Sequence, residues 1–223
     1  MRPLLVCLLL AAHAFAVPKN IRVTVRLIEV EPAELTRLMD RHPGSSAELF
    51  ADTLDLVSKG KAKSIDTVSQ TVFNAKEATA ESILERSYPT QYILMSFGPV
   101  QQPELAVSWH VSPICVPADW DTRNMGSSFE IWPWFVRDTG LINIQIVPEW
   151  VDETEPTIWK ESSFRWGKTA DRMPTFTTLR VNCSVLVAPG KPMLAAVLTP
   201  QPDPKPPALP RKLLLFVRAD VVG

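Results

Sequence analysis

Apolar and polar residues alternate along residues 21–30, which read I-R-V-T-V-R-L-I-E-V. The odd-numbered positions from Ile21 to Leu27 are apolar, and Arg22, Thr24 and Arg26 lie between them. A period of two is typical of a strand with one face in the core and the other in water. The segment therefore predicts an opening β-strand.

A short helix is predicted directly after this strand. Pro32 suits the first turn of a helix, where its missing N–H is not needed. Leu35, Leu38 and Met39 then recur at helical spacing and predict the buried side of this helix.

A second helix is predicted to begin at Ser45, because Ser45 and Glu48 have the spacing of a capping box. Gly60 is placed to end this helix in a left-handed cap. The predicted apolar stripe consists of Ala47, Phe50, Leu54 and Val57, with Leu49 and Leu56 beside it.

From residue 61 the period changes to two, which predicts a polar, Thr-rich strand over 61–72 and a turn at 74–76. The pattern of 78–92 fits either a helix or a strand. We predict a strand there because a hairpin signal precedes it. In the proline-rich segment 97–121, residues 105–111 predict one further strand.

The clearest predicted hairpin joins strands at 128–137 and 141–148 through Asp138-Thr139-Gly140. Residues 151–172 are charged and aromatic without a steady period and predict a long loop.

A further hairpin is predicted from strands at 176–187 and 192–198, joined by a turn at 188–191. The proline-rich segment 200–210 predicts an extended linker, and residues 213–222 predict a last, strongly apolar strand. With 21 prolines in 223 residues, long helices are disfavoured. The predicted fold is α+β and mainly β, with antiparallel hairpins and one or two short N-terminal helices packed on the sheet.

The first sixteen residues have the pattern of a signal peptide. Arg2 is followed by a short apolar run, and Ala14-Phe15-Ala16 has the small-x-small form of a cleavage site. Cys7 lies too early in this segment, and after Val6, for a lipoprotein signal. We predict a signal peptide at 1–16 and one domain at 17–223, and no membrane-spanning helix in the latter.

The chain is nearly neutral, with 23 basic and 24 acidic residues. No large field of one sign is present to attract a nucleic acid, so we predict no nucleic-acid partner.

Cys115 and Cys183 remain after signal cleavage, in a compartment where disulfides persist. They either form one disulfide or remain two buried thiols.

No pattern in the sequence predicts an enzyme, a metal site or a cofactor. His110, Cys115 and Asp119 contain the side chains of a nucleophilic set but lack a context that would expose the thiol. The acidic residues near Asp152, Glu153 and Glu155 lack the spacing and glycine of a calcium loop, so a solvated loop is favoured.

Seven tryptophans offer a candidate interaction surface. Trp132 and Trp134 are two residues apart on a predicted strand and so share a face. The alternatives are core packing and an exposed surface that binds glycans, peptides or lipid. The candidate residues are Trp132, Trp134, Trp150, Trp159 and Trp166.

The ordered set of elements resembles the secretin domain of type II and type III secretion and type IV pilus channels. The sequence V-x-V-x-L-I-E-V at 23–30 is similar to the family's first strand, and a helix follows it. The strand, asparagine turn and strand at 62–78 also resemble the family, as does Pro89 after them. Further matches are the hairpin with Pro133 and Pro148, the Thr-rich strand at 177–190 and the terminal strand at 213–219.

The chain departs from the family at Ala195-Ala196, where secretins usually carry a Gly-Gly pair, and at the polyproline linker that follows. The resemblance implies a non-enzymatic role in the assembly of secretion or pilus machinery. It also implies a homo-oligomer or other envelope proteins as partners, and a place in the periplasm or outer membrane of a Gram-negative-type bacterium. The alternative is a periplasmic or secreted binding module that uses the tryptophans.

Overall fold

A computed structural model describes residues 20–95, 114–164, 167–200 and 211–222. The predicted mainly-β α+β class is confirmed: the described residues form two helices and nine strands, and all strand pairings are antiparallel. In chain order the elements are β1 (Asn20–Val30), α1 (Pro32–Arg41), α2 (Ser46–Ser58), β2 (Ala62–Phe73), β3 (Ala78–Met95), β4 (Ile114–Val136), β5 (Leu141–Phe164), β6 (Gly167–Arg180), β7 (Cys183–Val187), β8 (Pro192–Leu198) and β9 (Lys212–Val222).

Sheet A consists of strands β2, β1, β9 and β8 in that spatial order. The last strand lies beside the first, with Val25 opposite Val217. Every residue from Leu213 to Val217 is buried, because one face of β9 packs on a second sheet and the other on the helices. The apolar run near the C-terminus is thus a strand covered on both faces.

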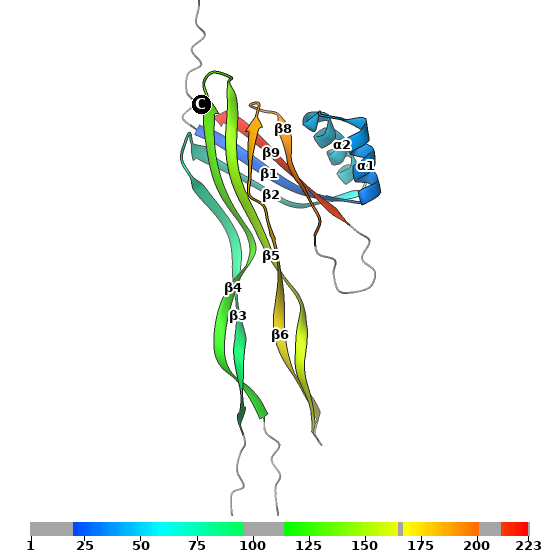
Figure 1. The fold of residues 1–223 in the computed structure, drawn as a ribbon, viewed down its shortest axis with the longest axis vertical. Coiled ribbons are helices and arrows are strands. Elements are labelled where there is room, and N and C mark those ends of the chain that lie inside the picture. Colours follow the sequence, from blue (N-terminus) through cyan, green and yellow to red (C-terminus); the bar gives the residue numbers. More distant parts are fainter. Residues whose placement is uncertain (1–19, 96–113, 165–166, 201–210, 223) are drawn as a thin grey trace, which may run out of the picture.

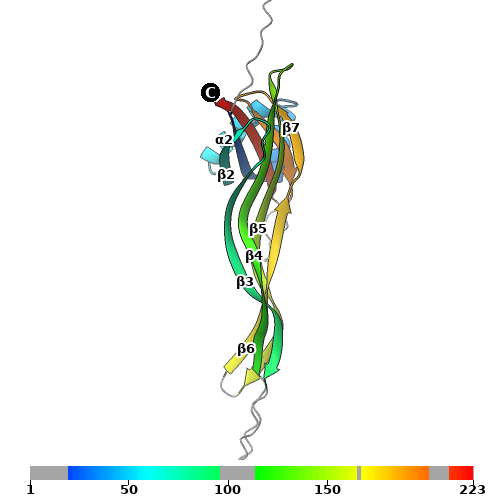
Figure 2. The same cartoon turned by 90° about the vertical axis from the view of Figure 1, so that its left-hand side faces the viewer.

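Sheet B has the order β3-β4-β5-β6, with β7 paired to β5. Its upper part packs against sheet A, and the core between them includes Ile142, Ile144, Ile146, Phe129 and Ile131. Figures 1 and 2 show the helices and sheet A beside this upper part, while the lower ends of β3 to β6 extend away from it. We call the packed part the head.

The two helices cover part of the outer face of sheet A. Leu38 of α1 and Leu49 of α2 pack in one cluster with Ile28, Val30 and Phe216 of the sheet. The predicted buried positions were wrong in part. Met39 and Ala47 are exposed, and the buried side of α2 instead includes Thr53, whose hydroxyl donates to the Leu49 carbonyl at 2.7 Å.

The predicted left-handed cap at Gly60 is confirmed. Gly60 has φ +70°, its N–H donates to the Val57 carbonyl, and the Lys61 N–H donates to the Leu56 carbonyl. These two bonds define a Schellman motif.

The predicted capping box at Ser45 was wrong. Ser45 is the N-cap residue of α2, but its side chain makes no cap hydrogen bond, and its ψ of 88° falls short of extended backbone. Glu48 instead lies with its Oε2 3.2 Å from Nδ1 of His42 at the end of α1.

Both flanking hairpin predictions were wrong, although their turns form. Ala75 has φ 59° and the Lys76 N–H donates to the Phe73 carbonyl, yet β2 pairs with β1 and β3 pairs with β4. The turn at 188–191 likewise leads from β7, which pairs with β5, to β8, which pairs with β9. At both turns the chain passes from one sheet to the other. The hairpin formed by β4 and β5 is confirmed.

The predicted loop at 151–172 was also wrong, because β5 runs to Phe164 and β6 begins at Gly167. These strands lie largely in solvent, so they lack the alternation of buried and exposed positions from which a strand is recognised. The predicted signal peptide at 1–16, the strand at 105–111 and nearly all of the linker at 200–210 lie outside the described residues.

Candidate interaction site

Sheet B divides where Gly126 of β4 faces Val151 of β5. From this pair to the pair of Val136 and Leu141, β4 and β5 are hydrogen-bonded neighbours. On the other side of it, β4 continues with β3 alone and β5 continues with β6 alone. Two separate two-stranded ribbons result, and Figure 1 shows both below the head. We call them the stem: ribbon 1 is residues 84–95 with 114–125, and ribbon 2 is residues 152–164 with 167–177.

A glycine is required at the dividing point. Gly126 has φ +111°, a conformation that L side chains rarely adopt, and a Cβ there would lie 2.2 Å from the Ser82 carbonyl oxygen of β3. Gly126 thus allows the backbone of β3 to approach β4 closely where β5 departs.

Each stem strand has one hydrogen-bonded neighbour among the described residues, so each has an unpaired edge. Unpaired edges present rows of N–H and C=O groups to any strand that approaches. An isolated two-stranded hairpin is marginally stable in water. The four edges of the stem therefore favour pairing with further strands.

Side chains, rather than backbone pairing, connect the two ribbons. The rings of Tyr88 and Phe176 lie 5.3 Å apart, and the Tyr92 hydroxyl donates to the Arg172 carbonyl at 3.1 Å. The ribbons are thereby held near one another while their edges remain open.

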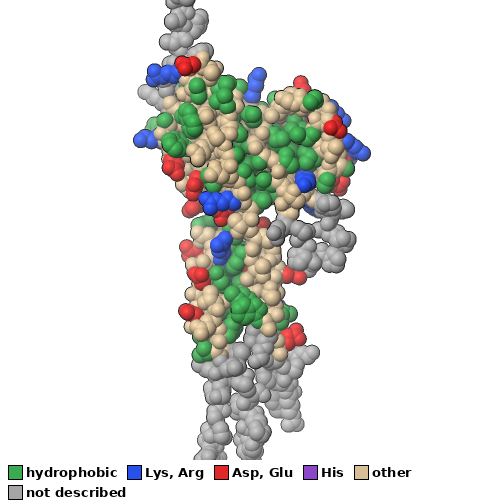
Figure 3. Space-filling view, in the orientation of Figure 1, with side chains coloured by type: hydrophobic (Ala, Val, Ile, Leu, Met, Phe, Trp, Pro, Cys, Tyr) green, Lys and Arg blue, Asp and Glu red, His purple; other side chains and the backbone are tan. Residues whose placement is uncertain are grey.

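The stem also exposes large apolar side chains, some of which Figure 3 shows on one face. Leu84 is 68% exposed, Trp120 is 59% exposed and Trp159 is 61% exposed. Large apolar side chains that gather in solvent favour association with proteins or membranes. The open edges and these exposed apolar side chains together form the candidate interaction site.

The five predicted tryptophans do not form one surface. Trp132 and Trp134 share an outward face as predicted, with ring centroids 5.9 Å apart, and Trp132 is 46% exposed. Trp150 packs at the core, edge-to-face with Phe129 at 5.2 Å. Trp159 is on ribbon 2, and Trp166 lies outside the described residues.

The two cysteines are placed far apart in the fold. Cys183 is a free, half-buried thiol, and burial raises its pKa. Cys183 lies opposite Ile146 of β5, which pairs with Ile131 of β4. Cys115 is also on β4, sixteen positions before Ile131, near the far end of ribbon 1. At ~3.3 Å per residue that is roughly 50 Å of strand, so the described structure contains no bridge between them.

No set of three or more metal-ligating side chains comes together within the described parts of the chain. Asp152, Glu153 and Glu155 lie along β5, and Asp119 lies on β4. His110 is outside the described residues. Neither described helix is long and apolar enough to cross a membrane.

Sequence reasoning missed Leu84, Trp120 and Gly126 as site residues. The lone glycine within a strand-like segment at 126 was the available signal, because such a glycine often marks a close approach of backbones. Nothing in the sequence marked Leu84 and Trp120 as exposed, because their exposure depends on whether another element packs over them in the folded protein.

No model of a known protein family matches the sequence, and no curated protein matches it. In structure, the chain is similar to secretin domains over 92% of its length. One is InvG of the Salmonella SPI-1 injectisome, with 11% identity, 64% of that chain covered and a TM-score of 0.46. The resemblance to secretins stated from the sequence is thus found in the structure as well.

Two further structures are similar over the same share of this chain. The type II secretin GspD of enteropathogenic Escherichia coli has 11% identity, 70% of its chain covered and a TM-score of 0.47. The type IV competence pilus secretin PilQ of Vibrio cholerae has 12% identity, 61% covered and a TM-score of 0.43. The chain thus spans about two thirds of the length of these structures.

Proposed function

We propose that this protein is a non-enzymatic structural component of a cell envelope that assembles by pairing the stem ribbons of neighbouring copies. The observation that carries the proposal is the separation of β4 from β5 beyond Gly126 and Val151. Two ribbons with open edges suit association of identical chains by strand pairing, in which the edge of one copy meets a different edge of the next.

The exposed side chains of the stem support the same role. Leu84, Trp120 and Trp159 are costly to leave in water, and association of stems would remove them from it. Exposed tryptophans such as Trp120 and Trp159 also suit a membrane–water interface. We place the protein in the periplasm or outer membrane, in protein-secretion or type IV pilus machinery, as the secretin resemblance implies.

Size determination of the chain from residue 17 to 223 tests this proposal. Light scattering with and without detergent, followed by negative-stain imaging, should reveal large rings. A strict monomer in mild detergent and at high concentration would contradict the proposal.

A matched pair of substitutions separates a stem effect from a general effect of added charge. Leu84→Lys places a charge on the stem, and Phe73→Lys places one at the end of β2 in the head, where the side chain is equally exposed at 67%. We expect Leu84→Lys to shift the protein toward monomers and Phe73→Lys to leave the assembly unchanged. Equal effects of the two would count against pairing through the stem.

The outward pair Trp132 and Trp134 favours a second function, binding of sugar rings by a secreted or periplasmic module. Their rings are in contact and lie on the face of sheet B away from the core. Replacing both with alanine should leave the protein folded, because neither side chain is buried. Glycan-array binding that the double variant loses would establish this function, and an array without any signal would exclude it for the glycans tested.

A further inference from the structure

The helices cover only part of the outer face of sheet A. On this face β1 presents first Arg22, Thr24 and Arg26, and then Ile28 and Val30. The two apolar residues pack with α1 and α2 in the cluster of Leu38, Leu49 and Phe216, whereas the three polar ones lie outside this cluster, and Arg26 meets α2 at the Phe50 ring. The part of this face outside the cluster is therefore polar and carries arginine.

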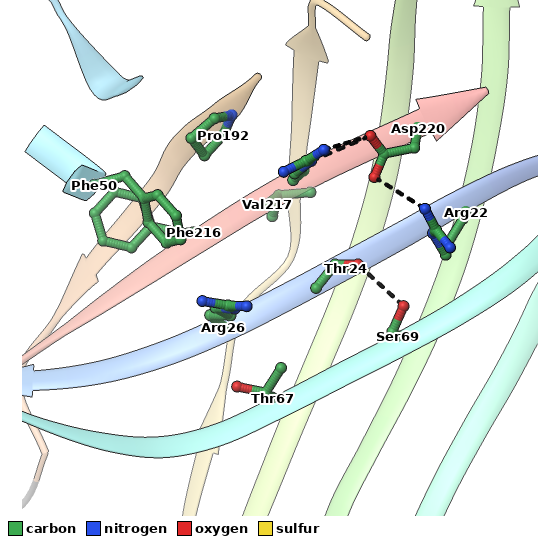
Figure 4. Close-up of a pocket in the computed structure, with 11 residues that line it drawn as sticks. Arg22, Thr24, Arg26, Phe50, Thr67, Ser69, Pro192, Phe216, Val217 and Asp220 are labelled. Atoms are coloured by element: carbon green, nitrogen blue, oxygen red, sulfur yellow. Dashed lines mark hydrogen bonds and ion pairs between the residues drawn. The ribbon is translucent and has the colours of Figure 1, made fainter. Parts of the chain in front are cut away.

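A cavity of about 400 Å³ lies over this polar part of the sheet, and Figure 4 shows the residues around it. Arginines from two neighbouring strands line it, namely Arg22 and Arg26 of β1 and Arg218 of β9. The walls are completed by Thr24, Thr67, Ser69, Phe50, Pro192, Phe216, Val217 and Asp220.

Positive charge exceeds negative charge in this cavity. Asp220 is the acidic residue among its lining, and it is engaged by Arg218 at 2.8 Å and by Arg22 at 3.9 Å. Three guanidinium groups thus face one carboxylate. The lining carries two positive charges that it does not neutralise itself.

Of the three arginines that line the cavity, Arg26 is the one without an acidic partner among the described residues. Its side chain is half-buried, with the guanidinium carbon 5.5 Å from the ring centroid of Phe50. Phe50 in turn packs edge-to-face on the buried Phe216 at 5.0 Å. The guanidinium is therefore positioned by aromatic contacts while its N–H groups remain available to a ligand.

The register brings further donors near Arg26. Thr24 lies opposite Arg218 across the strands, so Arg26 and Arg218 are diagonal neighbours, about 7–8 Å apart at Cα in such a ladder. The Thr24 and Ser69 hydroxyls share one hydrogen bond at 3.0 Å. One hydroxyl proton of that pair is left to donate to a ligand oxygen.

We propose that this cavity binds a phosphate group, presented as a monoester or as inorganic phosphate. A phosphate accepts hydrogen bonds from several directions and pairs with guanidinium groups in a bidentate manner. Its charge of nearly −2 at neutral pH matches the two uncompensated positive charges of the lining. A single carboxylate would neutralise only one of them. This site is not needed for strand pairing through the stem or for sugar binding by Trp132 and Trp134.

Titration calorimetry of the chain from 17 to 223 with inorganic phosphate, and with acetate as the comparison, tests the proposal. We expect phosphate to bind and acetate to bind much more weakly. Arg26→Gln should lower the affinity for phosphate by about tenfold or more, because it removes a charge-assisted contact. Arg37→Gln removes the same charge on α1, outside the cavity, and should leave the affinity unchanged.

Asp220→Asn gives a prediction of opposite sign. It removes the negative charge of the cavity, so phosphate should bind more tightly to this variant than to the wild type. Weaker binding to Asp220→Asn, or equal weakening by Arg26→Gln and Arg37→Gln, would overturn the proposal. So would acetate binding as tight as phosphate binding.

The source of the phosphate is resolved with vesicles. Co-sedimentation with phosphatidylcholine vesicles that contain phosphatidic acid, lost in Arg26→Gln, would identify a lipid headgroup. Binding of inorganic phosphate without such co-sedimentation would identify a free phosphate compound. Absence of both would overturn the proposal.

Discussion

The indole N–H of Trp150 donates a hydrogen bond to Oδ2 of Asp66 at 3.0 Å. Trp150 belongs to β5 of sheet B and Asp66 to β2 of sheet A, so this bond links the two sheets. It lies one residue from Val151, where the stem leaves the head. The bond therefore ties the base of ribbon 2 to the edge strand of sheet A.

Loss of this bond should destabilise the head. Trp150→Phe keeps an aromatic ring against Phe129 but removes the donor, and we expect it to lower the free energy of unfolding by about 1–2 kcal/mol. Urea unfolding measures the loss. In a double-mutant cycle with Asp66→Ala, the coupling should be about 1 kcal/mol. Strict additivity would show that the bond contributes nothing to stability.

Gly126→Ala should destabilise the protein more than a comparable change elsewhere. The added Cβ would meet the Ser82 carbonyl at 2.2 Å in a backbone conformation unfavourable to alanine, so we expect a loss of roughly 2–4 kcal/mol. Gly44 has a similar φ of +84° but open space around it. Gly44→Ala should thus cost only about 1 kcal/mol, and equal losses in thermal unfolding would contradict the role of the close approach.

The contacts of His42 should make stability depend on pH. Its Nε2 lies 2.8 Å from Asp52 Oδ2, and hydrogen bonds to Asp52 and then Glu48 raise the pKa of His42 above its ordinary value of 6.5, although desolvation opposes this. The hydrogen bonds from His42 and Arg41 lower the pKa of Asp52 from 3.8.

Because the pKa of His42 is higher in the folded protein than in the unfolded chain, His42 stabilises the fold. This stabilisation is complete at a pH below the unfolded-state pKa and is lost as the pH rises through the folded-state pKa. The contribution of Asp52 is lost in the opposite direction, as pH falls through its lowered pKa. The midpoint of thermal unfolding should therefore decline from pH 6 toward 8 more steeply in the wild type than in His42→Gln. Parallel profiles of the two proteins would contradict this prediction.

Phe216 should be among the most sensitive core positions. It belongs to β9 of sheet A, is 2% exposed and packs edge-to-face on Phe50 of α2. Phe216→Ala should cost about 3–5 kcal/mol in chemical unfolding. The control Phe73→Ala removes the same ring from a position that is 67% exposed and should cost about 0.5 kcal/mol or less.

The sequence by itself determined where the elements of the head lie. The alternation from Ile21 to Leu27 predicted β1, Gly60 predicted the end of α2, and Asp138-Thr139-Gly140 predicted the hairpin of β4 and β5. These features depend on local backbone preference and on burial of one face. Both are encoded in neighbouring residues.

Only the tertiary structure decided which strands pair and which surfaces stay open. The turns at 74–76 and 188–191 have ordinary turn residues, yet each leads to the other sheet, because pairing is set by the burial of distant strands such as β9. Residues 78–92 were predicted as a strand, but the stem parts of β4 and β5 and most of that of β6 were unrecognised, because a strand in solvent has no apolar period. The arginine cavity likewise depends on the tertiary structure, because its lining brings together β1, β9 and α2, which are distant in the sequence.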